Sequence, residues 1–360
     1  MAAQSVDDLW GYLHGYLHAQ ALMTGCKLRI FDELKNEPKT ASDICIILGA
    51  ELDAVERLLN ALVSLGALSR VSPDDFGSND DKFINSDLSS RYLTTESPMT
   101  LRPCILVADK YLYGLAGNLS FGVRDGNPQA ERAFGISSRK FYKDSAKSDD
   151  EKLLLLASMH SKATVFYRDA ATKSFDLSQY KHACNIGGGT GAVAFALAAV
   201  YQHMKVTVLD VPSVVEVASK FTPADPYSHN VTFKGGNIFK GSFPDVDLFV
   251  LTDIVHKWPE QRIKQLLCRL FDSLSAGGAV LILDCFHEDD KRGSLAASMM
   301  GLLMLLTSTE RCFQRSFADM CDLLRKIGFV EVKVKKNGDI VQSMIATKPP
   351  IDNGELDVHL

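Results

Sequence analysis

Apolar runs of strand length alternate with helix-length segments through the second half of the chain. The expected strands lie at 183–186, 205–209, 231–234, 247–252 and 279–283, and the expected helices at 192–201, 212–221, 261–274 and 317–326. Two further runs, 329–335 and 341–347, are predicted to form a closing hairpin. This alternation with short links favours an α/β fold with a Rossmann-like, doubly wound and mostly parallel sheet.

Residues 7–70 follow a helical pattern instead. Leucines on one face predict a helix pair over 17–34 with a break around Gly25, a helix beginning at Ser42 and a third helix over 52–65. Runs at 66–71 and 83–84 flank a polar turn, and the whole is typical of a winged helix. Binding to DNA needs several basic residues, whereas the third helix carries only Arg57 as a cation. A packing or dimerisation module is therefore favoured.

A glycine-rich turn follows the first strand of the predicted sheet, with glycines at 187, 188, 189 and 191. Such a turn lets the backbone approach a ligand, and the helix after it offers unpaired N–H groups. Asp210 follows the next strand, where an acid can accept hydrogen bonds from both hydroxyls of a ribose. These residues predict a nucleoside cofactor. Gly187, Gly189 and Ala192 also satisfy the G-x-G-x-x-A fingerprint, so a nicotinamide cofactor stays open at this point.

Ligands of doubly wound sheets bind at the carboxyl ends of the strands. That rule is expected to place Gly187, Asp210, Asn237, Asp253, His256 and Asp284 along one rim.

The composition of the chain mainly excludes other classes of protein. Basic and acidic residues number 39 and 44, and no Lys/Arg run predicts a nucleic-acid surface. The N-terminus lacks the order of a signal peptide, and the longest apolar stretch, 296–306, is too short to span a membrane.

The eight cysteines are scattered, with no C-x-x-C motif and no Cys/His cluster at zinc spacing. No metal site is expected, and a reducing, cytoplasmic location is favoured.

Several motifs in this order carry a resemblance to a known family: GCKLRIFDEL, the GGGTG turn, LDVPSVVE, GNIFK, DIVHKWPE and SAGGAVLILD. The chain resembles the small-molecule O-methyltransferases that use S-adenosylmethionine, a group with plant, bacterial and animal members. The resemblance implies S-adenosylmethionine as the cofactor in place of a nicotinamide and a hydroxylated aromatic small molecule as the substrate. It also implies a homodimer joined through the winged-helix domain.

The resemblance also implies roles for individual residues. His256 matches the catalytic histidine of the family, Asp284 matches an acid that orients its imidazole, and Gln314 takes the place of a glutamate beside the base and the substrate. On the cofactor side, Gly187 and Gly189 would follow the methionine and ribose, Asp210 would bind the ribose hydroxyls, Asn237, Ile238 and Phe239 would frame the adenine, and Asp253 would lie near the cofactor.

The implied domains are a winged-helix dimerisation domain at 1–100, a helical linker and substrate-pocket region at 101–150, and an S-adenosylmethionine-binding catalytic domain at 151–348. A flexible tail is expected at 349–360, and the catalytic domain is predicted to begin with one long helix over 151–173.

Five positions depart from the family pattern. They are Asn185 and Asn237 in place of acids, Asp253 where a cation is usual, Lys257 where an acid is usual, and Gln314. They favour an alternative in which the protein binds a cofactor or partner without methyl transfer.

Overall fold

The computed structural model of the protein describes residues 5–71, 81–137, 148–289, 294–310, 312 and 314–350. The chain forms two compact units, one made of residues 1–114 and 148–165, the other of 115–147 and 166–360. The first unit is therefore discontinuous in sequence. Of the predicted tail, residues 351–360 lie outside the described part of the chain.

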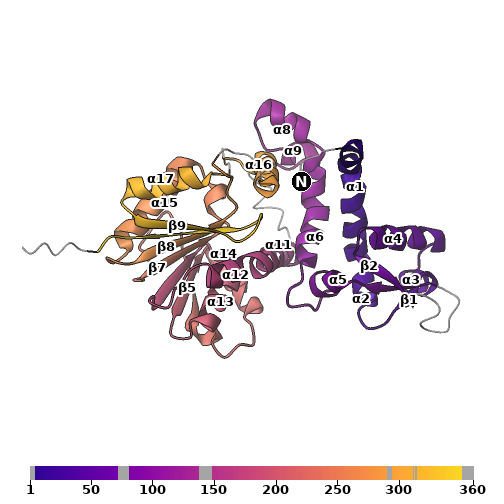
Figure 1. Ribbon diagram of the computed structural model, residues 1–360, viewed down its shortest axis with the longest axis horizontal. Helices are drawn as coiled ribbons and strands as arrows, with labels where there is room; N and C mark the ends of the chain where they lie inside the picture. Colours follow the sequence, from indigo (N-terminus) through magenta and orange to yellow (C-terminus); the bar gives the residue numbers. More distant parts are fainter. Residues whose placement is uncertain are drawn as a thin grey trace, which may run out of the picture. The chain divides into compact units, whose positions relative to one another are not determined.

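The first unit is mostly helical and contains a small three-stranded sheet with the order β1-β3-β2 (Figure 1). Its elements are α1 (Val6–Lys27), α2 (Ile30–Glu33), β1 (Lys39–Thr40), α3 (Ala41–Leu48), α4 (Leu52–Ser64), β2 (Leu68–Val71), β3 (Lys82–Asn85), α5 (Asp87–Tyr92), α6 (Arg102–Val107), a π-helical turn (Ala108–Leu112) and α11 (Asp149–Lys162). Helices α3 and α4 followed by the β2–β3 hairpin give the arrangement expected of a winged helix.

The first predicted helix break is wrong. Helix α1 runs through Gly25, and the chain turns only at Leu28 and Arg29. Gly25 is buried, and a Cβ added there would lie 3.1 Å from the Phe31 ring and 3.2 Å from Leu62. The glycine lets the helix pack closely instead of ending it. Helix α3 begins as a capping box, in which Thr40 and Asp43 exchange side-chain-to-backbone hydrogen bonds.

The second unit contains the predicted doubly wound sheet. Its seven strands have the order β6-β5-β4-β7-β8-β10-β9; the first five are parallel, and β10 runs antiparallel to both of its neighbours, β8 and β9. The strands are β4 (His182–Ile186), β5 (Lys205–Asp210), β6 (Val231–Gly235), β7 (Leu248–Thr252), β8 (Ala279–Asp284), β9 (Val330–Lys336) and β10 (Gln342–Thr347). The predicted strands and closing hairpin are confirmed to within about two residues at their ends.

Helices cover both faces of this sheet (Figure 1). Helices α15 (Glu260–Ser273) and α17 (Phe317–Ile327) lie on one face, and α12 (Arg168–Lys173) and α13 (Ala192–Val200) on the other. The unit also contains α8 (Leu119–Asp125), α9 (Ala130–Phe134), α14 (Pro212–Ala218) and α16 (Leu295–Thr307), and α7 (Tyr113–Ala116) lies where the chain passes between the units. No helix of the described residues combines the length and apolar character needed to cross a bilayer.

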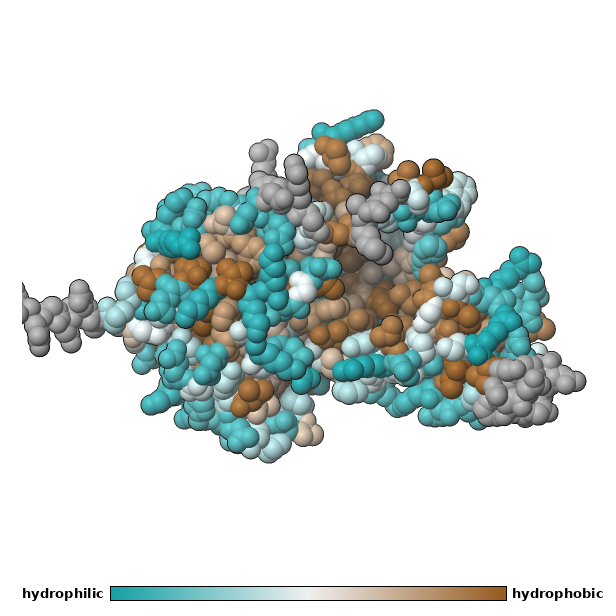
Figure 2. Space-filling model, viewed as in Figure 1, coloured by the Kyte–Doolittle hydropathy of each residue, from teal (hydrophilic) through white to brown (hydrophobic). Residues whose placement is uncertain are grey.

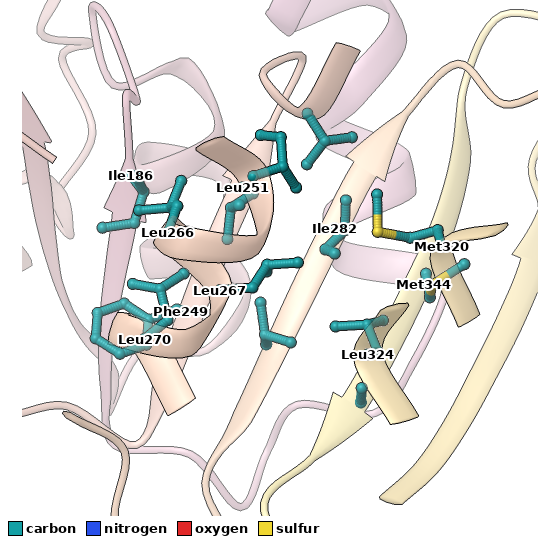
Figure 3. Close-up of a cluster of buried hydrophobic side chains, with 14 of the residues drawn as sticks. Ile186, Phe249, Leu251, Leu266, Leu267, Leu270, Ile282, Met320, Leu324 and Met344 are labelled. Carbon is teal, nitrogen blue, oxygen red and sulfur yellow. The ribbon is translucent and has the colours of Figure 1, made fainter. Parts of the chain in front are cut away.

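The largest core fills the space between the sheet and helices α15 and α17. Figure 3 shows Leu266, Leu267 and Leu270 of α15 facing Ile186, Phe249 and Leu251 of the sheet, while Met320 and Leu324 of α17 face Ile282 and Met344. The amphipathic pattern of each helix therefore sets which face it buries. This packing fixes the strands, and with them the loops that leave their carboxyl ends.

Two helices differ from the sequence-based expectation. The predicted helix over 151–173 is α11, a π-helical turn at Ala163–Tyr167 and α12 in succession. The apolar stretch at 296–306, considered above only as a membrane span, forms helix α16. The π-helical turn at Ala163–Tyr167 inserts one residue into the helix, and turns of this kind often occur at functional sites.

Candidate active site

The candidate site lies in the second unit, at the carboxyl ends of β4, β5, β7 and β8. The chain adds β5 and β6 on one side of β4 and then returns to place β7 on the other side. This reversal at β4 is the place where open α/β sheets bind their ligands. Of the ten residues predicted for the site, all are described and all belong to this unit.

The glycine turn after β4 is tightly packed on its inner side. A Cβ at Gly188 would lie 2.5 Å from the Oδ1 atom of Asn185 and 3.0 Å from Val208. Asn185 is buried, and its Nδ2 donates to the carbonyl of Val250 at 3.1 Å. Its Oδ1 has no hydrogen-bond partner within the described part of the chain. The turn therefore holds an unsatisfied acceptor directly behind the glycines, beside the start of helix α13.

Asp210 connects the turn to the end of β5. Its Oδ2 accepts a hydrogen bond from the Gly189 N–H at 2.8 Å, and its Oδ1 accepts from the Val211 N–H at 2.7 Å. Each carboxylate oxygen can accept about two hydrogen bonds, so capacity remains on both. The carboxylate is thus fixed in orientation and still able to accept two ligand hydroxyls.

The predicted adenine frame is a compact turn after β6. The Oδ1 atom of Asn237 accepts the Phe239 N–H at 2.8 Å, which closes an Asx turn. Ile238 and Phe239 pack against the main core, and Phe239 meets Trp258 edge-to-face at 5.1 Å. The guanidinium of Arg262 lies over both rings, 4.5 Å from Phe239 and 4.2 Å from Trp258. Asn237, which was expected to help frame the adenine, therefore uses its side-chain oxygen to shape this turn.

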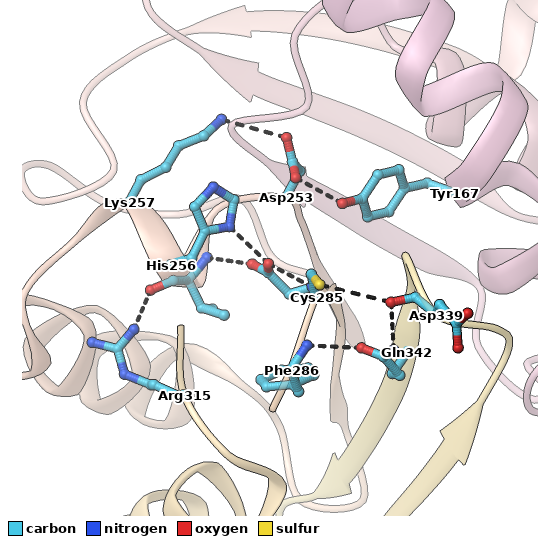
Figure 4. A network of polar contacts seen from close by, with 11 residues as sticks. Tyr167, Asp253, His256, Lys257, Cys285, Phe286, Arg315, Asp339 and Gln342 are labelled. Carbon is cyan, nitrogen blue, oxygen red and sulfur yellow. Dashed lines mark hydrogen bonds and ion pairs between the residues drawn. The ribbon is translucent and has the colours of Figure 1, made fainter. Parts of the chain in front are cut away.

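His256 and Asp284 form a buried pair. The His256 ring is 3% exposed, and its Nδ1 lies 2.7 Å from the Oδ1 of Asp284, which is 1% exposed. Asp284 also accepts the backbone N–H groups of Val255 at 2.9 Å and Cys285 at 2.8 Å. Because a carboxylate only accepts, the bond places the proton of the neutral ring on Nδ1 and leaves the lone pair on Nε2. In Figure 4 this second nitrogen of His256 lies on the far side of the ring from the nitrogen that makes the dashed hydrogen bond.

Asp253 lies beside this pair at the end of β7, in a left-handed conformation with φ of 55°. Its carboxylate accepts the Tyr167 hydroxyl at 2.7 Å and lies 3.8 Å from the Lys257 ammonium (Figure 4). Burial and the Asp253 carboxylate hold the pKa of Tyr167 well above its ordinary value, so the hydroxyl remains a donor. Tyr167 is the last residue of the π-helical turn.

Asp253, His256 and Asp284 offer atoms within 4.8 Å of one another that could in principle hold a metal ion. The hydrogen bonds just described already engage both carboxylates and the Nδ1 of the histidine. A metal bound through the Nδ1 of His256 would replace the bond that orients the imidazole. The arrangement therefore fits a hydrogen-bonded general base better than a metal centre.

Gln314 lies in the segment between α16 and α17 and is 6% exposed. Its Nε2 has no hydrogen-bond partner among the described residues, which exclude its neighbours 311 and 313. A buried amide donor without a partner costs about 1–3 kcal/mol, so this position is poised to bind an acceptor atom.

Sequence reasoning missed Tyr167 and Arg315 at this site. Arg315 is 3% exposed and donates from its guanidinium to the carbonyls of Val255 and Trp258, on either side of His256. Nothing in the pattern around Tyr167 marks it as more than a helix residue. The adjacency of Arg315 to Gln314 was the one available signal.

Comparison with known proteins shows the family in which the fold and the site occur. Residues 117–330 match the O-methyltransferase domain, and residues 10–95 match the O-methyltransferase dimerisation domain. The chain belongs to the S-adenosylmethionine-dependent O-methyltransferase family. The family resemblance of the motifs is confirmed, and S-adenosylmethionine replaces the nicotinamide alternative as the cofactor.

Several relatives resemble the whole chain. Chicken acetylserotonin O-methyltransferase is 31% identical over 342 residues, which cover 94% of this chain and 96% of that protein. A human probable bifunctional dTTP/UTP pyrophosphatase/methyltransferase protein is 31% identical over 338 residues, and the match spans 93% of this chain but only 53% of that longer protein. The crystal structure of human N-acetylserotonin methyltransferase with S-adenosylmethionine matches with a TM-score of 0.88 and 27% identity, covering 97% of this chain and 99% of that one.

We expect Gly188→Ala to lower the free energy of unfolding by about 1–3 kcal/mol, because the new Cβ would overlap the Asn185 amide. Denaturant unfolding of the purified protein measures the change. The same substitution made in an Asn185→Ala background is the matched control, since removing the amide opens the space. An equal cost in both backgrounds would show that the contact is not responsible.

Proposed function

We propose that this protein transfers a methyl group from S-adenosylmethionine to the hydroxyl oxygen of an aromatic small molecule. The observation that carries the proposal is the buried His256–Asp284 hydrogen bond at the carboxyl ends of the strands, on the same sheet as the glycine turn and Asp210. S-adenosylmethionine would supply an activated methyl group there.

His256 acts in this proposal as the general base. A phenolic hydroxyl has a pKa near about 10 and is a weak nucleophile until its proton is removed. Asp284 holds the ring in the tautomer whose Nε2 lone pair is available, and it stabilises the imidazolium that forms when Nε2 takes the proton. Gln314 contributes a buried amide donor, which would orient an acceptor atom of the substrate.

The cofactor would be held by the residues around the glycine turn. Gly187 and Gly189 allow close approach of the backbone, and Asp210 has the remaining hydrogen-bonding capacity for two ribose hydroxyls. Asn237, Ile238 and Phe239 would border the adenine from the turn after β6. Asp253, which pairs with Lys257 and Tyr167, would border the methionine part.

Two departures from the family pattern weigh against the catalytically silent alternative. Asp253 stands where relatives carry a cation and Lys257 where they carry an acid, and in this structure the two side chains face each other at 3.8 Å. The two substituted side chains are therefore matched in charge with each other in this structure. The retained His256–Asp284 pair points the same way.

The similarity to acetylserotonin O-methyltransferases makes N-acetylserotonin the first acceptor to test. Helix α16, which runs into the segment with Gln314, is rich in partly exposed apolar residues, including Met299. Such a surface suits an aromatic ring. The scattered free thiols support the cytoplasm as the location of the reaction.

The match to a dimerisation domain supports a homodimer. Helix α1 carries a stripe of exposed apolar side chains at helical spacing, and Figure 2 shows brown side chains over this helix. The stripe is Val6, Leu9, Trp10, Leu13, Tyr16 and Leu17. A row of this length is unusual on an isolated surface and suits burial against a second copy.

The first test of this proposed function concerns the base. His256→Gln should lower kcat for methyl transfer by about 10²- to 10⁴-fold, because the other described groups that bond Asp284 are the backbone N–H groups of Val255 and Cys285, which cannot take the proton. The assay follows labelled methyl transfer from S-adenosylmethionine to N-acetylserotonin and a panel of phenols. His182→Gln, at the exposed start of β4, is the control and should leave the rate unchanged. Undiminished turnover in His256→Gln would refute the assignment.

The second prediction concerns cofactor binding. Asp210→Asn should weaken the affinity for S-adenosylmethionine by about 10- to 100-fold, because a neutral amide replaces charge-assisted hydrogen bonds. Calorimetric titration measures the change, with Asp272→Asn on the exposed face of α15 as the control. Equal affinities for the two variants would rule out Asp210 as the ribose ligand.

The third prediction concerns assembly. Leu13→Glu should shift the protein from dimer to monomer in sedimentation experiments, because it places a charge within the apolar stripe of α1. His18→Glu adds the same charge on the same helix outside the stripe and should leave the dimer intact. A dimer that survives Leu13→Glu would mean that another surface joins the subunits.

A further inference from the structure

The histidine that would act as base sits on a very short element. His256 is the middle residue of a single 3₁₀ turn, Val255–Lys257, between β7 and α15. A backbone hydrogen bond from the Lys257 N–H to the Ile254 carbonyl, at 3.0 Å, closes this turn. A single turn has little stability of its own, so other groups must fix the position of the imidazole.

Side chains from the segment that ends with Arg315 bind two carbonyls of this turn and the carbonyl of the residue that follows it. Arg315 donates from Nη1 to Val255 and from Nη2 to Trp258, the second at 2.8 Å. The Cys312 thiol donates to Lys257 at 2.9 Å. The two nitrogens of one guanidinium thus bond the carbonyls just before and just after the His256–Lys257 pair (Figure 4 shows the bond to Val255).

The backbone of Arg315 is itself tied next to Asp284. Its carbonyl accepts the His287 N–H at 2.9 Å, and His287 follows β8 by three residues. Val255 is consequently held from two sides, with its N–H bonded to Asp284 and its carbonyl bonded to Arg315. The His256 ring and the turn that carries it are therefore both held in place relative to the end of β8.

We propose that Arg315 is a positioning residue for methyl transfer, whose guanidinium clamps the turn that carries His256 so that the imidazole keeps its bond to Asp284. The inference rests on the proposed role of His256 as base. Arg315 acts through the turn and need not touch the substrate. The planar fork of arginine suits this task, because it reaches two carbonyls in a fixed geometry that a lysine ammonium cannot reproduce.

The burial of the Arg315 charge supports a positioning role for this side chain. Arg315 is 3% exposed, and burial lowers the pKa of its guanidinium although Asp284 and Glu260 act in the opposite direction. An arginine nevertheless remains charged in proteins. Removing a guanidinium from water costs free energy that two carbonyl partners only partly restore, so an apolar residue would serve simple packing better.

The test compares Arg315→Lys and Arg315→Met with the native protein and with Arg325→Lys, an exposed arginine on α17. We expect Arg315→Lys to lower kcat by about 10- to 100-fold, because misplacement of a catalytic group by about 1 Å has an effect of that size. The KM for the acceptor and the affinity for S-adenosylmethionine should stay unchanged, the melting temperature should fall by only a few degrees because a buried carbonyl loses its donor, and Arg325→Lys should behave as the native protein. Arg315→Met should lose at least as much kcat.

A second readout is independent of turnover. The Nδ1–H of a histidine bonded to a carboxylate gives a low-field proton resonance, which can be assigned here by its loss in His256→Gln. We expect Arg315→Lys to shift or broaden this resonance. Native kcat together with an unchanged resonance in Arg315→Lys would overturn the proposal. So would a joint fall of kcat, cofactor affinity and melting temperature, which would indicate a merely structural role.

Failure of the base assignment would look different. In that case His256→Gln would keep its turnover, while the resonance would still report whether Arg315 holds the ring against Asp284. The lysine variant keeps the charge and most of the volume, so it tests the clamp even if Arg315→Met does not fold.

Discussion

The carboxylate of Asp284 is the group on which the arrangement of the site depends. It accepts three hydrogen bonds, from the His256 ring, the Val255 N–H and the Cys285 N–H. Because it terminates β8, its position follows from the register of the sheet and from the core beneath it. Taking a carboxylate out of water is expensive unless donors surround it, and here one of the donors is the imidazole proposed as the base. The same bonds therefore stabilise the acid and orient the imidazole.

The sheet was predictable because its signals are local. Apolar runs ending in Ile186, Thr252 and Asp284, with glycine turns and amphipathic helices between them, leave few alternatives to a doubly wound sheet. Gly25 was misread because a glycine signals a break by sequence alone, whereas its function here is close packing against Phe31, which only the tertiary structure reveals.

The site was predictable only in part, for a physical reason. The rule that ligands bind at the carboxyl ends of the strands, together with the family resemblance, indicated His256, Asp284 and Asp210, since each lies at or after the end of a strand at the same edge of the sheet. Contacts between distant segments carry no such local mark. The bond from Tyr167 to Asp253 depends on a π-helical turn, and that from Arg315 to Val255 on a loop returning past β8. Likewise, Asp253 and Lys257 read separately as two irregularities, whereas the structure shows one ion pair.

The discontinuous first unit has a consequence for how the protein can be divided. Helix α11 belongs to that unit and packs on α6, yet the chain continues from it through the π-helical turn into α12 and the sheet. A cut near residue 100 would take away α1, which packs on α6, and so would uncover part of the helix on which α11 rests. The two sequence regions that match separate family domains are therefore not separable modules in the folded chain. Loss, duplication or exchange of either one in evolution would have to carry α11 along with the first unit.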